Sequence, residues 1–314
     1  MPWPTWDEAA KAALISALLV VVLRRVRPTR VSQALLPAAW EFSFVASLYS
    51  IWRLARMLPI AREEGALERA RQIALWQDRF RLPSELSVQD WVVDRDWLVW
   101  LTTLYYAMVH VPALIIFLIW MWVRHRDQYK TWRTALALST CFCLLIRFLR
   151  VAPPRLLPEY GFVDLTDRMG VSVYGSVGTG ISDQYAAMPS IHVAWAAIIS
   201  FGVFALSPSR WRWLILTHVF VTIWVVAATG HHWWFDGIVA LALLGIALWI
   251  DQLGRSRWEG RLARFTPLAP ERVVAMARAD NQANENARAS TSPLDLPSVS
   301  PGESVPPGEK AVIG

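Results

Sequence analysis

Residues 97–123 read WLVWLTTLYYAMVHVPALIIFLIWMWV, an apolar run that is interrupted mainly by His110 and Pro112. A helix needs about 20 apolar residues to cross the hydrocarbon core of a bilayer. This run is longer than that, and it contains no Asp, Glu, Lys or Arg. It therefore predicts a transmembrane helix and places the chain among the integral membrane proteins.

Further apolar segments lie on both sides of this run, and the first of them is short and carries Lys11 at its start. Hydrophobic residues make up 55% of the chain and charged residues 18%, a balance that soluble domains rarely show. We predict an all-α integral membrane protein with a six-helix transmembrane core bundle and an extra N-terminal helix. The further segments are 9–23, 38–58, 134–150, 189–206, 212–229 and 234–252.

Residues 60–88 differ from these segments, because apolar positions such as Ile73 and Trp76 are interspersed with dense charges. This pattern predicts one amphipathic helix, which lies at a membrane surface or packs over the bundle. The end of the chain is rich in Ser, Pro, Asn and Ala, which is typical of a disordered tail. The predicted organisation is N-terminal transmembrane helices at 1–59, an amphipathic segment at 60–96, a transmembrane core at 97–253, a basic cytoplasmic segment at 254–279 and the tail at 280–314.

The charges between the apolar segments indicate how the bundle is oriented. Loop 24–30 has four arginines and no acid, and 124–133 and 207–213 are also basic, whereas 151–188 and 230–236 are acidic. Basic loops favour the cytoplasmic side. We therefore expect a multi-pass protein of the plasma membrane, with the acidic loops outside and the C-terminus in the cytoplasm. Since the basic residues lie in short loops, the net charge of +6 does not indicate a nucleic-acid partner.

Three groups of polar residues fall on the predicted outer side, and the first is APPR at 152–155. Its two prolines end a helix and present Arg155 at the membrane surface. Arginine binds phosphate oxygens in a bidentate manner, and Arg147 and Arg150 lie nearby. Taken alone, such an arginine is more often one whose side chain snorkels to the interface.

The second group is MPSIH at 188–192, which opens the next apolar segment. Pro189 suits the first turn of a helix, where its missing N–H costs nothing. The free N–H groups of that turn and the Ser190 hydroxyl form an anion site. His192 lies close enough to donate a proton to a leaving oxygen. Taken alone, the group is more often an ordinary helix start with an interfacial histidine.

The third group is TGHHWWFD at 229–236, in which His232 and Asp236 are four residues apart. Residues at this spacing meet on one helix face. A carboxylate bonded to one imidazole nitrogen fixes the tautomer and leaves the other nitrogen as a nucleophile. A His–Asp pair that only stabilises the fold has the same spacing, so this interpretation stays open. His231 is a weaker candidate, because its neighbour at the same spacing is Phe235.

Together the three groups predict phosphoryl transfer by double displacement at the outer membrane face. His232 is the predicted nucleophile, Asp236 its orienting carboxylate and His192 the acid, while Arg155 and Ser190 hold the phosphate. The expected partners are a lipid phosphate substrate and membrane lipids. Two other classes stay open: a polytopic transporter or channel with a His–Asp proton relay, and an inactive scaffold.

Neither a metal nor another cofactor is expected at these residues. The outer acids Asp164, Asp167 and Asp183 are scattered through a glycine-rich loop, without the dense ligand spacing of a metal cage.

At these motifs the chain resembles the type-2 phosphatidic acid phosphatase superfamily. The sequences of its motifs are similar to those of the inositol-phosphorylceramide-synthase-like (inositolphosphotransferase) branch. The resemblance covers roughly residues 98–250. It implies a six-helix core with a metal-independent site at one membrane face, and it implies the roles given above for each residue. The phrases that carry it are APPR at 152–155, GFVD at 161–164, AAMPSIHV at 186–193 and TGHH at 229–232.

Two positions depart from the family pattern. The first motif of the superfamily begins with a lysine seven residues before its arginine, and Phe148 stands there. Its third motif has an arginine six residues before the nucleophilic histidine, and Val226 stands there. Fewer cationic ligands make a phosphomonoester substrate a poorer fit. A phosphodiester or pyrophosphate-linked lipid is consistent with this pattern, and water and an alcohol both stay open as acceptors.

Overall fold

The structure is a computed structural model that describes residues 4–57, 65–169, 184–265, 282–283 and 285–286. Within these ranges the chain is helical and has no β-strand, and one isolated parallel bridge joins Val151 to Ala186. This confirms the all-α prediction for the described residues. The predicted tail at 280–314 falls almost entirely outside them, as does the middle of the acidic loop at 170–183. Contacts divide the chain into two compact units, and the first of these, Met1–Arg255, is described below.

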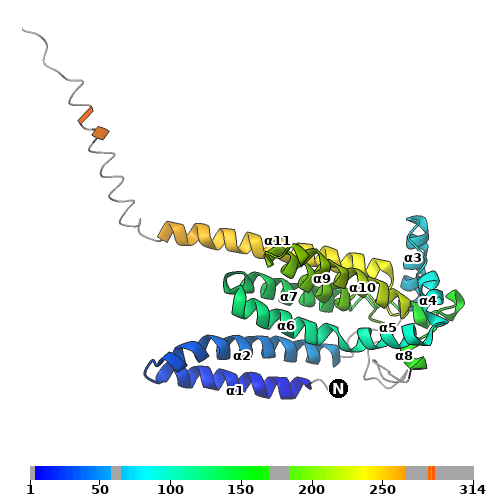
Figure 1. Ribbon diagram of the computed structural model, residues 1–314, viewed down its shortest axis with the longest axis horizontal. Coiled ribbons are helices and arrows are strands. Elements are labelled where there is room, and N and C mark those ends of the chain that lie inside the picture. Colours follow the sequence, from blue (N-terminus) through cyan, green and yellow to red (C-terminus); the bar gives the residue numbers. More distant parts are fainter. Residues whose placement is uncertain (1–3, 58–64, 170–183, 266–281, 284, 287–314) are drawn as a thin grey trace, which may run out of the picture. The chain divides into compact units, whose positions relative to one another are not determined.

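The helices that follow residue 95 run alongside one another in the first unit (Figure 1). The opening apolar run forms two helices that bend by 48° at Val109. Pro112 explains the bend. Its backbone nitrogen has no hydrogen to donate, and its ring crowds the carbonyl of Met108. The helices are α5 (Asp96–Met108), α6 (His110–Arg124), α7 (Arg126–Ile146), α9 (Ile191–Leu206), α10 (Leu216–Ala228) and α11 (Trp234–Phe265).

Among the described residues, three helices are long and apolar enough to cross a membrane: Arg30–Ala55, Arg210–Ala228 and Trp234–Ser256. The bent pair would be a fourth span, and α9 is a shorter apolar helix. The predicted segment 9–23 is helical and 134–150 is helical as far as Ile146, but neither is among the helices that are long and apolar enough to cross a membrane. Several apolar helices of this kind are compatible with a multi-pass membrane protein.

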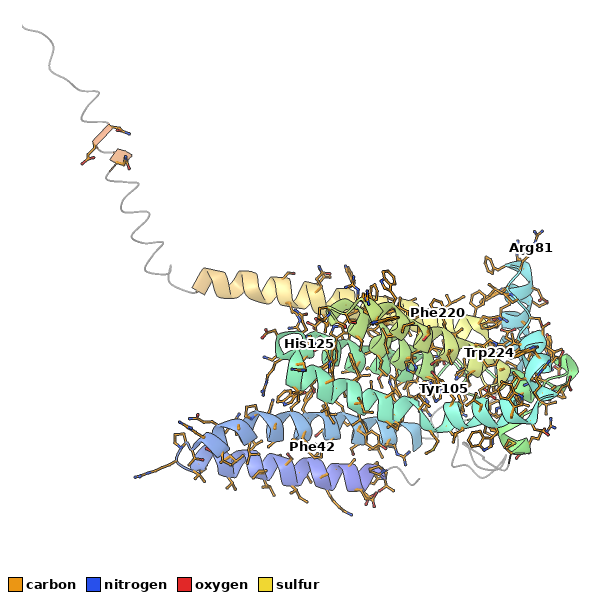
Figure 2. The ribbon with its side chains drawn as sticks, viewed as in Figure 1. Phe42, Arg81, Tyr105, His125, Phe220 and Trp224 are labelled. Atoms are coloured by element: carbon orange, nitrogen blue, oxygen red, sulfur yellow. The ribbon has the colours of Figure 1, made fainter. Side chains whose placement is uncertain are left out.

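Large apolar side chains cover the outside of these helices, as expected for surfaces that face lipid. Phe42 on α2 and Phe220 on α10 are 57% and 68% exposed (Figure 2). The interior is packed with aromatic and aliphatic side chains from five helices. Its buried members include Phe117, Met121, Trp132, Ile198 and Leu244.

The first two helices, α1 (Trp6–Arg25) and α2 (Arg30–Met57), form an antiparallel hairpin. Small residues let their backbones approach, and serine hydroxyls donate across the interface. Ser16 donates to the Ala39 carbonyl at 2.8 Å, and Ser43 donates to the Ala13 carbonyl at 2.9 Å. The predicted N-terminal helix is therefore present and is paired with α2.

The predicted single amphipathic helix at 60–88 is wrong in one respect. Two helices, α3 (Ala66–Arg79) and α4 (Glu85–Val93), stand in its place, and residues 58–64 lie outside the described ranges. Between the two helices Arg81 adopts a φ of 56° and Pro83 follows it. Neither a left-handed residue nor the residue before a proline continues a helix readily, so the chain turns here.

Helices α3, α4 and the short α8 (Leu165–Arg168) gather at one end of the bundle (Figure 1). The connections between α1 and α2 and between α6 and α7 lie at the opposite end. These connections are thus separated from residues 230–233 by the length of the helices. The predicted loop 124–133 is shorter than expected, because α7 begins at Arg126, and the orientation in the membrane stays a prediction.

Candidate active site

Helix α10 ends in a turn that the sequence specifies through Gly230. This residue has a φ of 69°, in the left-handed region that glycine tolerates best. Its N–H donates to the Ala227 carbonyl at 2.9 Å, and the His231 N–H donates to the Val226 carbonyl at 3.1 Å. These two bonds make a Schellman motif. A Cβ at position 230 would lie 3.3 Å from the Cβ of Arg155, so the turn also needs a glycine for space.

The chain leaves this turn and delivers His232 into the buried interior, where the residue is 4% exposed. Its Nδ1 lies 2.7 Å from the Ala187 carbonyl oxygen and 3.3 Å from Oδ2 of Asp236. Both partners can only accept when Asp236 is ionised, so this network assigns the proton of a neutral imidazole to Nδ1. The Nε2 atom then carries the lone pair that a nucleophile needs.

Asp236 joins three segments and is fully buried. Its Oδ2 also accepts from the Trp233 N–H at 2.8 Å, and its backbone carbonyl accepts from the Ser190 N–H at 3.1 Å. The carboxylate therefore orients His232 and closes the first turn of α11, while the backbone carbonyl of Asp236 ties that turn to the start of α9. His232 and Asp236 meet as predicted, but not on one helix face, because His232 precedes the first residue of α11.

Helix α9 begins with its own cap, since the Ser190 hydroxyl accepts from the Val193 N–H at 3.4 Å. His192 follows in the first turn, and its ring centroid lies 5.9 Å from that of His232. Tyr106 on α5 packs against the His192 ring with the centroids 4.5 Å apart. The structure thus brings His192 and Ser190 to the segment that holds His232 and Asp236, as the sequence predicted.

Arg155 lies in a 3-10 turn, Pro154–Leu156, and its backbone N–H donates to the Gly230 carbonyl at 3.0 Å. Its side chain is 5% exposed, and Nη1 pairs with Oδ2 of Asp164 at 2.9 Å. Burial opposes ionisation of Asp164, but the Thr166 hydrogen bond and the Arg155 charge outweigh it and hold the pKa of that carboxyl below its usual value. The guanidinium is therefore held in one orientation by a permanent charge.

A short parallel bridge joins the first two motifs. The Val151 N–H donates to the Tyr185 carbonyl at 2.8 Å, and the Ala187 N–H donates to the Val151 carbonyl at 3.0 Å. Ala187 is the residue whose carbonyl accepts from His232. The three polar groups are therefore assembled at one end of the bundle by main-chain hydrogen bonds.

Arg147 and Arg150 lie between α7 and the bridge. Arg147 caps the end of α7, and the Arg150 carbonyl accepts from Nε of Arg69 on α3 at 2.6 Å. The contact of these two arginines with a phosphate stays a prediction.

The two departures from the family pattern have different surroundings. The Phe148 side chain is 43% exposed. The Val226 side chain is buried, and its carbonyl accepts from the N–H groups of both His231 and His232. The backbone of position 226 therefore holds His231 and His232 in place although the cationic side chain is missing.

His231 differs from its neighbour in environment. Burial and the positive charge of Arg155 lower the pKa of His231 to about 3, so this imidazole is neutral at pH 7. Its Nδ1 lies 3.0 Å from the Thr229 carbonyl oxygen. The ring packs on Tyr106, with centroids 4.5 Å apart. These contacts are those of a structural histidine.

Two further histidines, His110 and His218, continue the series of ring contacts that joins His232 to His192. Sequence reasoning missed them, because it treated His110 only as an interruption of an apolar run. The His110 ring lies 4.9 Å from that of His192 and 6.2 Å from that of His218. The hydroxyl of Tyr105 (Figure 2) lies 2.7 Å from Nδ1 of His218. The signal was present in the sequence, since polar rings inside apolar helices are rare and need partners.

Within the described part of the chain, no group of three or more His, Cys, Asp or Glu side chains could hold a metal ion. Independence from metal ions stays a prediction.

Comparison with known proteins gives one match. A family model described as the PAP2 superfamily matches residues 71–250, a range that contains α4 to α10, all three motifs and the first half of α11. No curated protein and no solved structure matches the chain significantly.

Proposed function

The chain belongs to the PAP2 superfamily, and from this membership and the geometry around His232 we propose that it is a metal-independent lipid phosphatase or phosphotransferase that acts through a phosphohistidine. One observation carries the proposal. Nδ1 of His232 faces two acceptors, the Ala187 carbonyl and the Asp236 carboxylate, which leaves Nε2 as a nucleophile beside an arginine and a second histidine.

In the first step, Nε2 of His232 attacks the phosphorus atom while the bond from phosphorus to the lipid oxygen breaks. Protonated His192 gives its proton to that oxygen, which leaves as an alcohol. Arg155 and the Ser190 hydroxyl hold the non-bridging oxygens, whose negative charge grows in the transition state. Asp236 stabilises the positive charge that develops on the His232 ring.

In the second step, neutral His192 takes a proton from the acceptor, whose oxygen attacks the phosphorus atom. The phosphorus–Nε2 bond breaks, and the neutral His232 is restored. Water as the acceptor gives a phosphatase, and an alcohol gives a transferase. The residues involved are the same in both cases.

The missing cations at positions 148 and 226 bear on the substrate. A phosphomonoester carries about two negative charges, whereas a phosphodiester carries one and needs fewer cationic ligands. We place the substrate among phospholipids and polyprenyl-phosphate-type lipids, with an alcohol acceptor of the inositolphosphotransferase kind as the favoured reaction. Phe148 and Val226 support this choice, because they stand where the family pattern has a lysine and an arginine.

The site is proposed to face the outside of the plasma membrane, with the C-terminus in the cytoplasm. The support is the charge of the loops at the two ends of the bundle. In a cysteine-free background, a cysteine placed at Asp167 is expected to react with a membrane-impermeant maleimide on intact cells, whereas a cysteine at Gln128 is expected to react only after lysis. Both positions are exposed. The opposite pattern would reverse the orientation.

The experiment that tests the mechanism is rapid-quench labelling of the purified protein with a lipid phosphate that carries ³²P. A protein-bound label is expected within the first turnover, stable in alkali and lost in acid, in a peptide that contains residues 231–232. The label is expected to form in the presence of a chelator. A protein that turns over the lipid without this label, or only with added metal, does not use the proposed mechanism.

A further inference from the structure

Asp236 accepts from the Trp233 N–H at the start of helix α11, but the next two N–H groups of the first turn need acceptors from elsewhere. The N-cap position of this helix is Trp233, and an indole side chain has no oxygen that accepts from the N–H groups of the first turn. Helix α9 differs, because Ser190 supplies that acceptor locally. The first turn of α11 contains Asp236 and directly follows His232, so whatever caps it also fixes the nucleophile.

The missing acceptors come from α3 and α4. The Glu85 carboxylate accepts from the Trp234 N–H at 2.9 Å, and the Gln77 side-chain oxygen accepts from the Phe235 N–H at 3.1 Å. The Trp234 indole N–H donates to the Pro83 carbonyl at 2.6 Å. Two helices far away in the sequence therefore complete the cap.

The two side chains that supply these acceptors lie in the interior of the protein. Glu85 and Gln77 are each 4% exposed. Burial raises the pKa of the Glu85 carboxyl, so its position inside the fold costs free energy that hydrogen bonds must offset. A buried carboxyl is uncommon unless its oxygens have partners, and here the partner is the helix that carries Asp236.

Gln89 lies one turn after Glu85 on the same face of α4, and it contacts the segment that precedes Asp164. Nε2 of Gln89 donates to the Val163 carbonyl at 2.9 Å and to the Ala228 carbonyl at 3.0 Å, and its Oε1 accepts from the Val163 N–H at 2.7 Å. Val163 precedes Asp164, which pairs with Arg155. Helix α4 thus contacts both the phosphate-binding segment and the nucleophile segment.

We propose that Glu85 and Gln77 are positioning residues for phosphate transfer, because they hold the first turn of α11 in the register that keeps Asp236 on Nδ1 of His232. The inference rests on the proposed function and extends it to two helices outside the core bundle. Neither residue touches the phosphate. A misplacement of about 1 Å at a reacting group can lower a rate about 100-fold, so a loosened cap is enough to slow attack.

The test is rapid-quench labelling in lipid nanodiscs with phosphatidylinositol that carries ³²P, a phosphodiester of the favoured kind, which separates two quantities. The burst amplitude counts functional sites, and the rate constant reports attack by each site. Glu85→Leu removes the acceptor at similar volume and is expected to lower the rate constant roughly 10- to 100-fold at full amplitude, with little change in KM. Glu85→Gln keeps an oxygen acceptor and is expected to stay within about threefold of the wild type.

Two more variants complete the design. Gln77→Leu removes the neighbouring acceptor from a neutral side chain and is expected to slow labelling in the same way, so the test does not depend on the folding of one variant. Asp90→Leu makes a similar change at an exposed acid on α4 and is expected to leave both quantities unchanged.

Three results would overturn the inference. One is a wild-type rate constant in both leucine variants, and a second is a lower amplitude with an unchanged rate constant, which indicates a merely structural role. The third is a Glu85→Gln variant as slow as Glu85→Leu, because the acceptor oxygen is then irrelevant. A wild-type protein that forms no phosphohistidine contradicts the proposed function instead.

Discussion

Replacement of His232 by glutamine is expected to lower lipid phosphate turnover by at least about 10⁴-fold and to abolish the protein-bound label. The amide of the introduced side chain can still hydrogen bond to the Ala187 carbonyl, so the local fold has a partner for it. No lone pair of comparable nucleophilicity remains, and direct attack by water has to replace the two-step route. Steady-state turnover and the labelled peptide measure this together.

The matched control is His231→Gln, because the two histidines are adjacent and both buried. His231 packs on Tyr106 and lies against the Thr229 carbonyl, so its replacement is expected to retain the label. A label that persists in His232→Gln and disappears in His231→Gln would transfer the nucleophile to the neighbouring residue. Similar thermal unfolding of the two variants in detergent checks that both are folded.

Replacement of His192 by glutamine is expected to slow labelling by roughly 10²- to 10⁴-fold with a phosphodiester lipid and far less with an alkyl p-nitrophenyl phosphodiester. A lipid alcohol has a high pKa and needs a proton as it leaves, whereas p-nitrophenolate is stable without one. His192 lies in the first turn of α9, with its ring 5.9 Å from that of His232, which suits a proton donor to the leaving oxygen. The ratio of the two rates is the measurement.

A residue that only shapes the pocket would not discriminate between leaving groups. Equal losses with both substrates would therefore remove the acid role from His192. The control is His125→Gln at the connection between α6 and α7, at the other end of the bundle (Figure 2). It is expected to leave both rates unchanged.

Much of the fold could be predicted, because each helix carries its own local signal. The seven apolar segments all became helical, and Pro112 even accounts for the bend in the opening run. The split between α3 and α4 was missed, although Pro83 and the turn at Arg81 explain it. The amphipathic pattern was given more weight than the turn residues, and that was the error.

Part of the candidate site could also be predicted. His232 and Asp236 are four residues apart and do meet, but not on one helix face as the spacing predicted, because His232 precedes α11 and only Asp236 lies in its first turn. Gly230 signals the end of α10 by its freedom to adopt a positive φ. The pairing of Arg155 with Asp164 was not foreseen, because nine residues of irregular chain give no fixed distance between two side chains.

By itself, the sequence determined the helices, the residue types of the site and the order of the motifs, because hydrophobic periodicity, capping and turn preferences act over a few residues. The tertiary structure alone decided which oxygens surround the nucleophile. The Ala187 carbonyl reaches His232 across 45 residues, and Glu85 reaches the Trp234 N–H across 149. A backbone carbonyl leaves no mark in the sequence, and a contact between distant segments exists only once the helices are packed.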